Sequence, residues 1–296
     1  MISILILMFE WFIQPYIIKD ITKFHFLGDK EYPELQKTVD ALCIKAGVKR
    51  PKLAIAPSRL PNVFIFGRSK SNSILVVNEG TLSLLSKDEL NVVLMREFYY
   101  LEHNDISAIT TLSFWPTLTF FAAGSLILYD LNYGENPRSN RDKVYIFALV
   151  GLLTFILYVL TLPFISIVSR KKVVLADEYS ATVLRSPENL STALIKITMF
   201  NASFSNARVS STSTKFLSLI DYFTAIKDSK ELLRNKEEIK KMLSSSTANY
   251  MFKSTRISEA NMWYTINSLF STHPKTFVRI QKLYKLKLDF DKDLKY

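Results

Sequence analysis

The chain has 296 residues, of which 48% are hydrophobic and 22% charged, and its formal net charge is +11. A mean hydropathy of +0.12 is high for so charged a chain, which indicates long apolar segments beside a charged soluble part. The single cysteine, Cys43, excludes an intrachain disulfide and is expected to pack in a helix. No motif of a nucleic-acid reader is present, so the basic excess is interpreted as a surface beside anionic lipid, without a nucleic-acid partner.

Residues 1–24 form an apolar N-terminal segment that Glu10 and Pro15 interrupt. It lacks a basic n-region and a small-residue cleavage site, so it is a poor signal peptide. Trp11 and Tyr16 are of the type that anchors a chain at a membrane interface. We expect this segment to associate with a membrane, either as a short span or as a helix lying in the interface.

The next residues predict one helix and a small sheet. Residues 31–47 have helical periodicity and end at Gly47, a suitable C-cap. Three short runs rich in β-branched and aromatic residues follow, separated by turn residues, and they predict a small antiparallel sheet: 52–56, 62–66 and 73–77. Ser86 then opens a second helix, because Glu89 three residues on completes a capping box.

Two stretches without any formal charge lie at 106–129 and 144–169. Each exceeds the roughly 20 residues that a helix needs to cross a bilayer core. The short polar connector between them predicts a transmembrane hairpin over residues 106–169. The basic run at 169–172 follows the second stretch directly, so the positive-inside rule places the flanking soluble parts in the cytoplasm of a multi-pass cell-membrane protein.

The C-terminal part is predicted to be helical with one loop. The helix of the second apolar stretch continues to about Leu184, and Ser186 with Pro187 begins another. Residues 201–214 are rich in Ser, Thr and Asn and predict a loop, and 227–243 predict a highly charged surface helix. A last amphipathic helix is expected over 273–286, with Pro274 near its first turn.

Several motifs in sequence resemble the HtpX family of membrane zinc metallopeptidases. They lie in the family's order around the apolar hairpin, and the resemblance spans nearly the whole chain apart from the N-terminal segment and residues 201–265. The matching stretches are PNVFIFG (61–67), DELNVVLMREFYY (88–100), SRKKVVLAD (169–177), SPENLSTALIKI (186–197) and LFSTHPKTFVRIQKL (269–283).

The resemblance implies an α+β fold, a mainly helical zincin-like peptidase domain with a small antiparallel sheet. In this interpretation residues 25–105 and 170–296 are the two parts of the peptidase-like domain. Residues 106–169 are the transmembrane hairpin between them, and 1–24 are the membrane-associated segment.

The family's zinc ligands are not present at the matching positions. The resemblance implies two histidines and a glutamate where this chain has Arg96, Tyr100 and Val173. An arginine stays protonated and offers no lone pair, a tyrosine is an uncommon zinc ligand, and a valine has no donor atom. We therefore expect no metal cofactor, and zinc only if an unrecognised ligand set exists.

Two acidic residues of the family pattern remain. Glu97 stands at the family's general-base position and Asp177 at the position of a carboxylate that orients a ligand. Without a metal-bound water, the catalytic role of Glu97 lapses, and Asp177 cannot replace a ligand. The three histidines are not expected to rebuild the site: His25 precedes the soluble domain, His103 points away from Glu97 on its helix, and His273 is expected at a helix start.

These observations favour a membrane-embedded pseudopeptidase that binds or regulates membrane proteins, misfolded proteins or an active paralogue. Asn62, Phe64 and Phe66 lie on the strand that matches the family's substrate side, where an extended polypeptide would add to the sheet edge. For Phe64 and Phe66 the plainer interpretation is sheet core.

Two other interpretations stay open. One is an active membrane metalloendopeptidase with an atypical metal site. The other is a structural or partner-binding membrane protein that uses the charged helix at 227–243.

Arg96 is expected to fill the space that a metal site would occupy and to pair with Asp177 or Glu97. Arg96→Ala should therefore lower the melting temperature of the folded protein, because a buried carboxylate would lose its counter-charge. An unchanged melting temperature would contradict this assignment.

Overall fold

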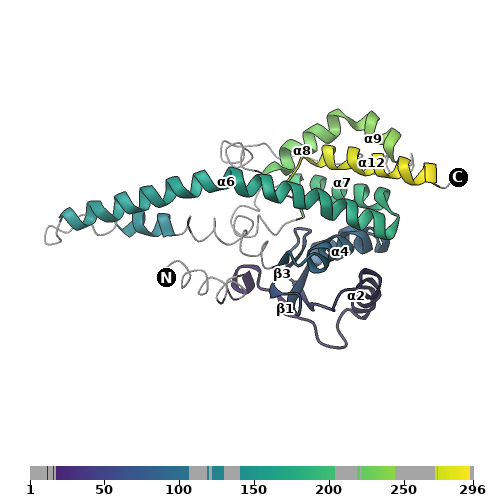
Figure 1. Ribbon diagram of the computed structural model, residues 1–296, viewed down its shortest axis with the longest axis horizontal. Coiled ribbons are helices and arrows are strands. Elements are labelled where there is room, and N and C mark those ends of the chain that lie inside the picture. The colour runs from purple at the N-terminus through teal and green to yellow at the C-terminus, as the bar shows by residue number, and fades with distance from the viewer. Residues whose placement is uncertain are drawn as a thin grey trace.

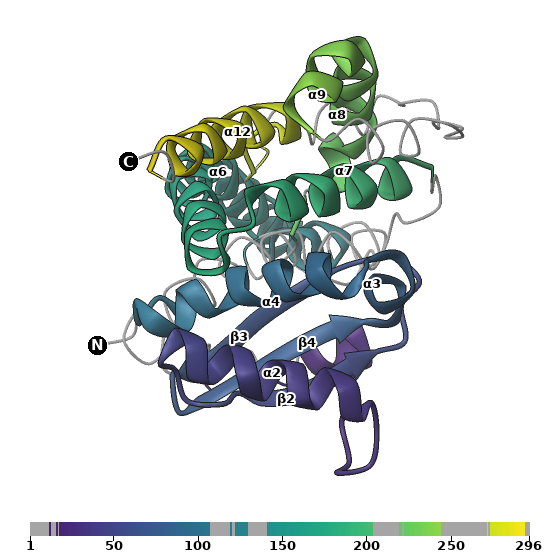
Figure 2. The same ribbon diagram turned by 90° about the vertical axis from the view of Figure 1, so that its right-hand side faces the viewer.

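The computed structural model of this chain describes residues 12, 16, 18–106, 119, 122–129, 141–203, 219–220, 222–243, 271 and 273–293. Its described part is mostly helical with one small sheet. One long helix, α6, runs along the molecule and projects well beyond the domain, away from the C-terminal end (Figure 1). The sheet with α2 and α4 lies on one side of that helix and α8, α9 and α12 lie on the other, whereas α7 lies beside α6 and packs on α4 (Figure 2).

The strands are short and the helices vary widely in length. The strands are β1 (His25–Phe26), β2 (Lys52–Ala56), β3 (Val63–Ser69) and β4 (Asn72–Asn78). The helices are α2 (Pro33–Ala46), α3 (Glu79–Leu84), α4 (Lys87–Glu102), α6 (Arg141–Leu184), α7 (Pro187–Ser203), α8 (Tyr222–Arg234), α9 (Lys236–Met242) and α12 (Thr276–Asp293).

The sheet has four strands in the order β1-β2-β4-β3 and is mixed. β3 and β4 form an antiparallel hairpin, but β2 pairs with β4 in parallel and with β1 in antiparallel orientation. The purely antiparallel sheet expected from sequence was therefore wrong in its pairing. Only two residues join β3 to β4, so these strands must be neighbours. The six residues 57–62, which contain two prolines, are no tight hairpin and carry the chain past β4 to the edge.

The two faces of the sheet pack against different parts of the chain. The face toward α2 and α4 belongs to the main hydrophobic core, with alternating strand residues Leu53, Ile55, Val63, Ile65, Leu75 and Val77. The other face packs against the N-terminal residues Ile18 and Phe24. α4 covers the first face, so its side chains lie between the sheet and the C-terminal helices (Figure 2).

α4 crosses this buried region and begins where the sequence predicts. The Ser86 hydroxyl accepts the Glu89 N–H at 3.3 Å, and the Glu89 carboxylate accepts the Ser86 N–H at 2.8 Å, which completes the predicted capping box. The Glu89 carboxylate also pairs with Lys196 of α7 at 2.8 Å. The start of α4 is thereby tied to the C-terminal helices. The predicted C-cap of α2 is also confirmed, since Gly47 has a φ of 64°.

α6 is a single helix of 44 residues and would be about 66 Å long at 1.5 Å per residue. Among the described residues, one helical stretch is long and apolar enough to cross a membrane, Phe147–Leu184 of α6. Residues 122–129 are helical and lie against it, because a Cβ on Gly151 would approach Leu126 and Ile127 within 3.2 Å. Most of the predicted first span and its connector, together with residues 204–218, lie outside the described residues.

The charged segment predicted as one surface helix at 227–243 is two helices with a buried side. α8 ends at Arg234, Asn235 makes a turn, and α9 follows. Leu232, Ile239 and Leu243 are buried against α7 and α12, so only the remaining charged face meets solvent. This buried side was not predicted from sequence, because charged residues outnumber the few apolar residues of the segment.

Replacement of the α4 cap should destabilise the domain measurably. Ser86→Ala removes the acceptor for the Glu89 N–H, and the loss should be about 1 kcal/mol of unfolding free energy. Chemical denaturation in mild detergent measures it, with Ser71→Ala in the exposed β3–β4 turn as the control. Equal midpoints for the two variants would show that the capping box does not contribute.

Candidate functional site

Arg96 lies on the buried side of α4 and only 2% of the residue is exposed. Its Nε donates to Asp177 Oδ1 at 2.9 Å, and its Nη1 donates to Glu97 Oε1 at 2.5 Å. Burial opposes the charge of the guanidinium, but Tyr100, Glu97 and Asp177 together outweigh it and raise the pKa of Arg96. Arg96 is thus a buried cation, and both pairings predicted for it from sequence are present.

Asp177 joins Arg96 to a second buried cation, Arg279 of α12. Arg279 Nε donates to Asp177 Oδ2 at 2.7 Å, and its Nη2 donates to Oδ1 at 2.8 Å, which is a bidentate pair. The side chains of both residues are at most 4% exposed. One carboxylate on α6 therefore holds guanidinium groups from α4 and α12 at once.

Glu97 uses both oxygens of its carboxylate inside the fold. Oε1 accepts from Arg96, and Oε2 accepts the main-chain N–H of Ile65 in β3 at 3.3 Å. Burial raises the pKa of Glu97, and Arg96 and the Ile65 N–H act in the opposite direction. With both carboxylates ionised, Arg96, Arg279, Glu97 and Asp177 form a charge-balanced group, which we call the buried ion cluster.

Tyr100 and Val173 complete the surroundings of the cluster. Tyr100 is one helical turn beyond Arg96 on α4, and burial raises the pKa of its phenol, so it stays neutral. Val173 precedes Asp177 by one turn of α6 and is 3% exposed. The structure therefore brings together Arg96, Glu97, Tyr100 and Asp177, with Val173 buried on the same face of α6 as Asp177.

Asn62, just before β3, binds a distant main-chain segment. Its Oδ1 accepts the N–H of Leu219 at 2.8 Å, and the Leu219 carbonyl accepts from Arg279 Nη1 at 3.1 Å. Phe64 and Phe66 point to the other face of the sheet, where the Phe66 ring lies 5.8 Å from that of Phe24. Their side chains are sheet core, which confirms the plainer sequence interpretation, and a polypeptide on β3 would meet main-chain atoms.

The donor atoms at this site do not suit zinc. A zinc site needs deprotonated thiolates, neutral imidazoles or carboxylates at about 2.0–2.3 Å in tetrahedral arrangement. Here a guanidinium without a lone pair, a neutral phenol and a valine stand at the implied ligand positions, and the nearby carboxylates already hold two guanidinium groups. We therefore derive no reaction step that involves a metal at this position.

The histidines do not offer a replacement. The His103 ring stacks on Tyr99 with centroids 4.2 Å apart, His273 is buried in the loop before α12, and His25 lies on the exposed strand β1. Among the described residues, no group of three or more His, Cys, Asp or Glu side chains is arranged to hold a metal ion.

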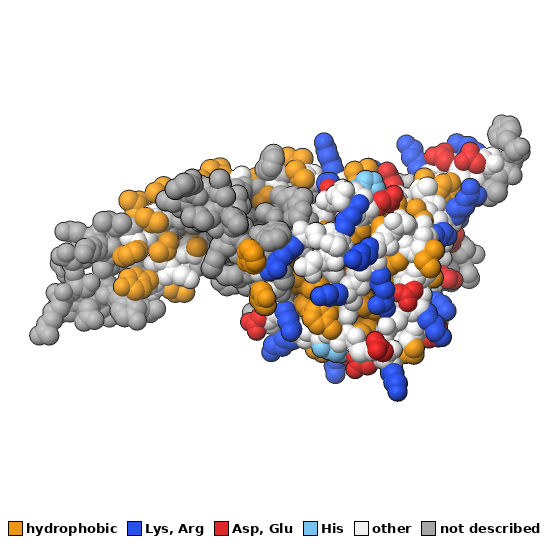
Figure 3. Space-filling view, turned by 60° about the horizontal axis from the view of Figure 1, so that its bottom comes forward, with side chains coloured by type: hydrophobic (Ala, Val, Ile, Leu, Met, Phe, Trp, Pro, Cys, Tyr) orange, Lys and Arg blue, Asp and Glu red, His pale blue; other side chains and the backbone are white. Residues whose placement is uncertain are grey.

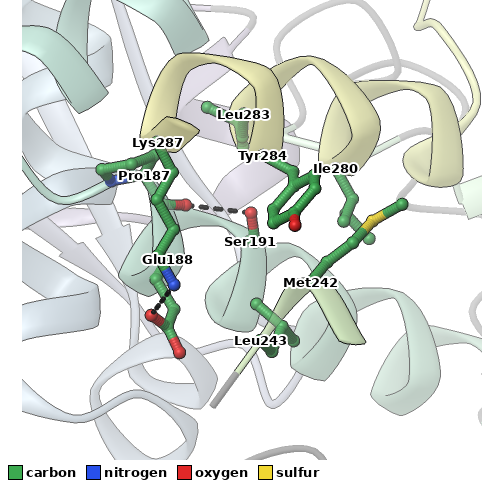
Figure 4. Close-up of a pocket in the computed structure, with 9 residues that line it drawn as sticks. All are labelled: Pro187, Glu188, Ser191, Met242, Leu243, Ile280, Leu283, Tyr284 and Lys287. Atoms are coloured by element: carbon green, nitrogen blue, oxygen red, sulfur yellow. Dashed lines mark hydrogen bonds and ion pairs between the residues drawn. The ribbon is translucent and has the colours of Figure 1, made fainter. Parts of the chain in front are cut away.

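A shallow pocket lies on the C-terminal helices, apart from the buried ion cluster (Figure 4). It is formed by α7, the end of α9 and α12, and Lys287 pairs with Glu188 across it at 2.9 Å. The other lining residues are Pro187, Ser191, Met242, Leu243, Ile280, Leu283 and Tyr284. The Glu188 carboxylate and the Lys287 ammonium at this pocket pair with each other, so we do not assign chemistry to it.

The comparison with protein families identifies the chain. The family described as Peptidase family M48 matches residues 29–287, which is most of the sequence. The chain therefore belongs to peptidase family M48.

Individual relatives agree with the HtpX resemblance. Protease HtpX homolog 2 of Methanosarcina acetivorans is 30% identical over 64% of this chain and 63% of its own length. Protease HtpX homolog of Methanothermobacter thermautotrophicus is 28% identical over 66% of this chain and 70% of its own length. The matches thus span about two thirds of these relatives. Among solved structures, the crystal structure of S. mikatae Ste24p is similar with a TM-score of 0.49 and 17% identity, over 95% of this chain and 57% of that chain.

Two residues of the site were not predicted from the sequence. Arg279 lies within the last matching motif, at the arginine of THPKTFVRI, but nothing in that motif states which carboxylate it binds. Leu219 lies between residues 201 and 265, where the resemblance gives no guide, and a lone leucine has no signal for a main-chain contact. Both become visible only when α12 and the residues before α8 are placed beside α4 and β3.

Removal of the shared carboxylate should be far more costly than removal of a surface carboxylate. Asp177→Asn keeps the shape but leaves two buried guanidinium groups without their common partner, so about 3–5 kcal/mol of unfolding free energy should be lost. Asp40→Asn is the matched control, because Asp40 pairs with Arg50 at an exposed place and should cost at most about 1 kcal/mol. Denaturation midpoints compare the two, and similar losses would contradict the cluster's role.

Proposed function

We propose that this chain is a catalytically silent member of its peptidase family, which acts by binding polypeptides rather than by cutting them. The observation that carries the proposal is the buried guanidinium of Arg96, which stands at an implied zinc-ligand position and has no lone pair. Tyr100 and Val173 point to the same conclusion, because neither is an effective zinc ligand.

The engagement of Glu97 supports the same proposal. A general base must reach the proton that it removes with a free lone pair at hydrogen-bond distance. One Glu97 oxygen is paired with Arg96 and the other with the Ile65 N–H, and the residue is 3% exposed. Glu97 is then a structural acceptor that connects α4 to β3.

We further propose that the chain is a multi-pass protein of the cell membrane, with 106–169 as a transmembrane hairpin. The projecting part of α6 carries exposed apolar side chains, whereas Lys and Arg side chains lie over the domain (Figure 3). The packing of residues 122–129 on Gly151 and the ring contact of Tyr129 with Phe147 fit two antiparallel helices. Residues 25–105 and 170–296 then form one cytoplasmic domain, and 1–24 associate with lipid.

The partners proposed are membrane lipid and polypeptides, either membrane or misfolded proteins or an active paralogue, and no nucleic acid. β3 is the edge strand of the sheet, so its outer side is where an extended polypeptide would add. The charged outer face of α8 and α9 is a second surface for a protein partner, and part of it already contacts the α12 region, where Lys275 pairs with Glu231 and Gln281 donates to Glu238.

The alternative is an active membrane metalloendopeptidase with an atypical metal site. The names of the relatives favour it, since they are called proteases. The two functions differ in one measurable property, the zinc content of the folded protein.

The first experiment is zinc analysis of the full chain purified in mild detergent, by mass spectrometry, together with a casein-cleavage assay. We expect zinc far below one equivalent and no cleavage above that of Glu97→Ala. An active relative purified in the same way is the positive control. Near-stoichiometric zinc together with cleavage that Glu97→Ala abolishes would overturn the proposal.

A variant with the implied ligands restored tests the positional assignment. Arg96→His with Tyr100→His and Val173→Glu offers two imidazoles and a carboxylate, which are suitable zinc ligands. If a thermal melt shows that this variant is folded, it should bind about one zinc per chain. Failure of the folded variant to bind zinc would contradict the assignment of these positions.

A further inference from the structure

The outer edge of β3 is engaged by the chain itself. β3 is the last strand of the sheet, with β4 on one side only. Main-chain groups on the free edge of a strand are those that an added polypeptide pairs with. The Ile65 N–H does not go to β4 but donates to Glu97, at 3.3 Å. One position of the polypeptide-binding edge is therefore occupied by a side chain of α4.

A second position near β3 holds a main-chain segment. Leu219 lies in neither a helix nor a strand, and its N–H and its carbonyl both form hydrogen bonds with side chains. Asn62 accepts the N–H at 2.8 Å and Arg279 donates to the carbonyl at 3.1 Å. A site that recognises a polypeptide without regard to its side chains uses the same contacts, one acceptor and one donor on the main chain.

The side chains of this segment fill a buried, apolar space. Leu219 is 0% exposed and Ile220 is 2% exposed, and both belong to the main core with α4, α7 and the inner face of the sheet. The position thus accepts two consecutive apolar side chains while the main chain is held by polar groups.

The two occupied positions are linked by a continuous path of hydrogen bonds. The path starts at Asn62, just before β3, passes through Leu219, Arg279, Asp177, Arg96 and Glu97, and reaches β3 at Ile65. The internal segment and the buried ion cluster therefore stabilise each other.

We propose that Leu219 and Ile220 are an internal ligand of the polypeptide site beside β3. An external polypeptide binds there only by replacing them, as an extended segment with two consecutive apolar residues, and Asn62 and Arg279 then hold its main chain. This proposal rests on the proposed polypeptide-binding function and adds to it the ligand class and the two residues that block access.

The test is competition with a labelled peptide of the chain's own sequence, FLSLIDYF (residues 216–223). Its affinity for the full chain in detergent micelles is measured by fluorescence anisotropy. In the double variant Leu219→Asp with Ile220→Asp the internal ligand should leave, because two carboxylates do not enter an apolar space. The folded double variant should bind the peptide at least about tenfold more tightly than the wild type.

Two controls make the result specific. The peptide FLSDDDYF, which carries the same two changes, should bind neither protein. Addition of Asn62→Ala to the double variant should remove the gain in affinity, because the acceptor for the ligand's N–H is lost. Equal affinity of the wild type and the folded double variant would overturn the proposal.

Hydrogen exchange provides a measurement that does not depend on the double variant folding. The Leu219 amide should be protected in the wild type, and Asn62→Ala should speed its exchange at least about tenfold while α7 is unchanged. Fast exchange in the wild type, or no change in Asn62→Ala, would overturn the proposal. Zinc analysis tests the proposed function separately. Bound zinc would contradict the proposed lack of catalytic activity, whereas these exchange rates report only on the internal ligand.

Discussion

The interaction on which the rest of this structure depends is the charge balance of the buried ion cluster. A single ion moved into a protein interior costs several kcal/mol, and that cost is met only when opposite charges and hydrogen bonds surround it. Here Asp177 holds Arg96 and Arg279, and Glu97 holds Arg96 from the other side. The four side chains come from α4, α6 and α12, so the balance also fixes how these helices lie relative to one another.

The same charge balance explains why the residues at the implied ligand positions fit a site without a metal ion. A metal ion would supply two positive charges near Asp177 and Glu97, and without it these carboxylates need another counter-charge. Arg96 supplies one from α4, and Arg279 supplies the second from α12. Val173 adds no further carboxylate, and Tyr100 stays neutral because burial raises the pKa of its phenol. A return to the family pattern would therefore have to alter several residues together.

Local features of the fold were predictable from sequence, and long-range pairings were not. The capping box at Ser86, the αL glycine at 47 and the helix start at Pro187 each depend on a few neighbouring residues. The place of β4 between β2 and β3 depends on how a short loop crosses the sheet, which periodicity does not encode. For the site, the pairing of Arg96 followed from its position, whereas the Leu219 contact joins residues 157 apart in sequence.

The Arg96–Glu97 pair connects the proposed loss of catalysis to the occupied edge of β3. Glu97 is the residue through which they meet, since its carboxylate binds Arg96 on one side and the edge of β3 on the other. Freeing Glu97 for chemistry would leave Arg96 with Asp177 alone and would expose the Ile65 N–H. Freeing the β3 edge for a polypeptide would likewise leave a buried carboxylate with only one partner. The proposed loss of catalysis and the occupation of the Ile65 N–H therefore involve the same Arg96–Glu97 ion pair, and neither could be reversed without a cost to the other.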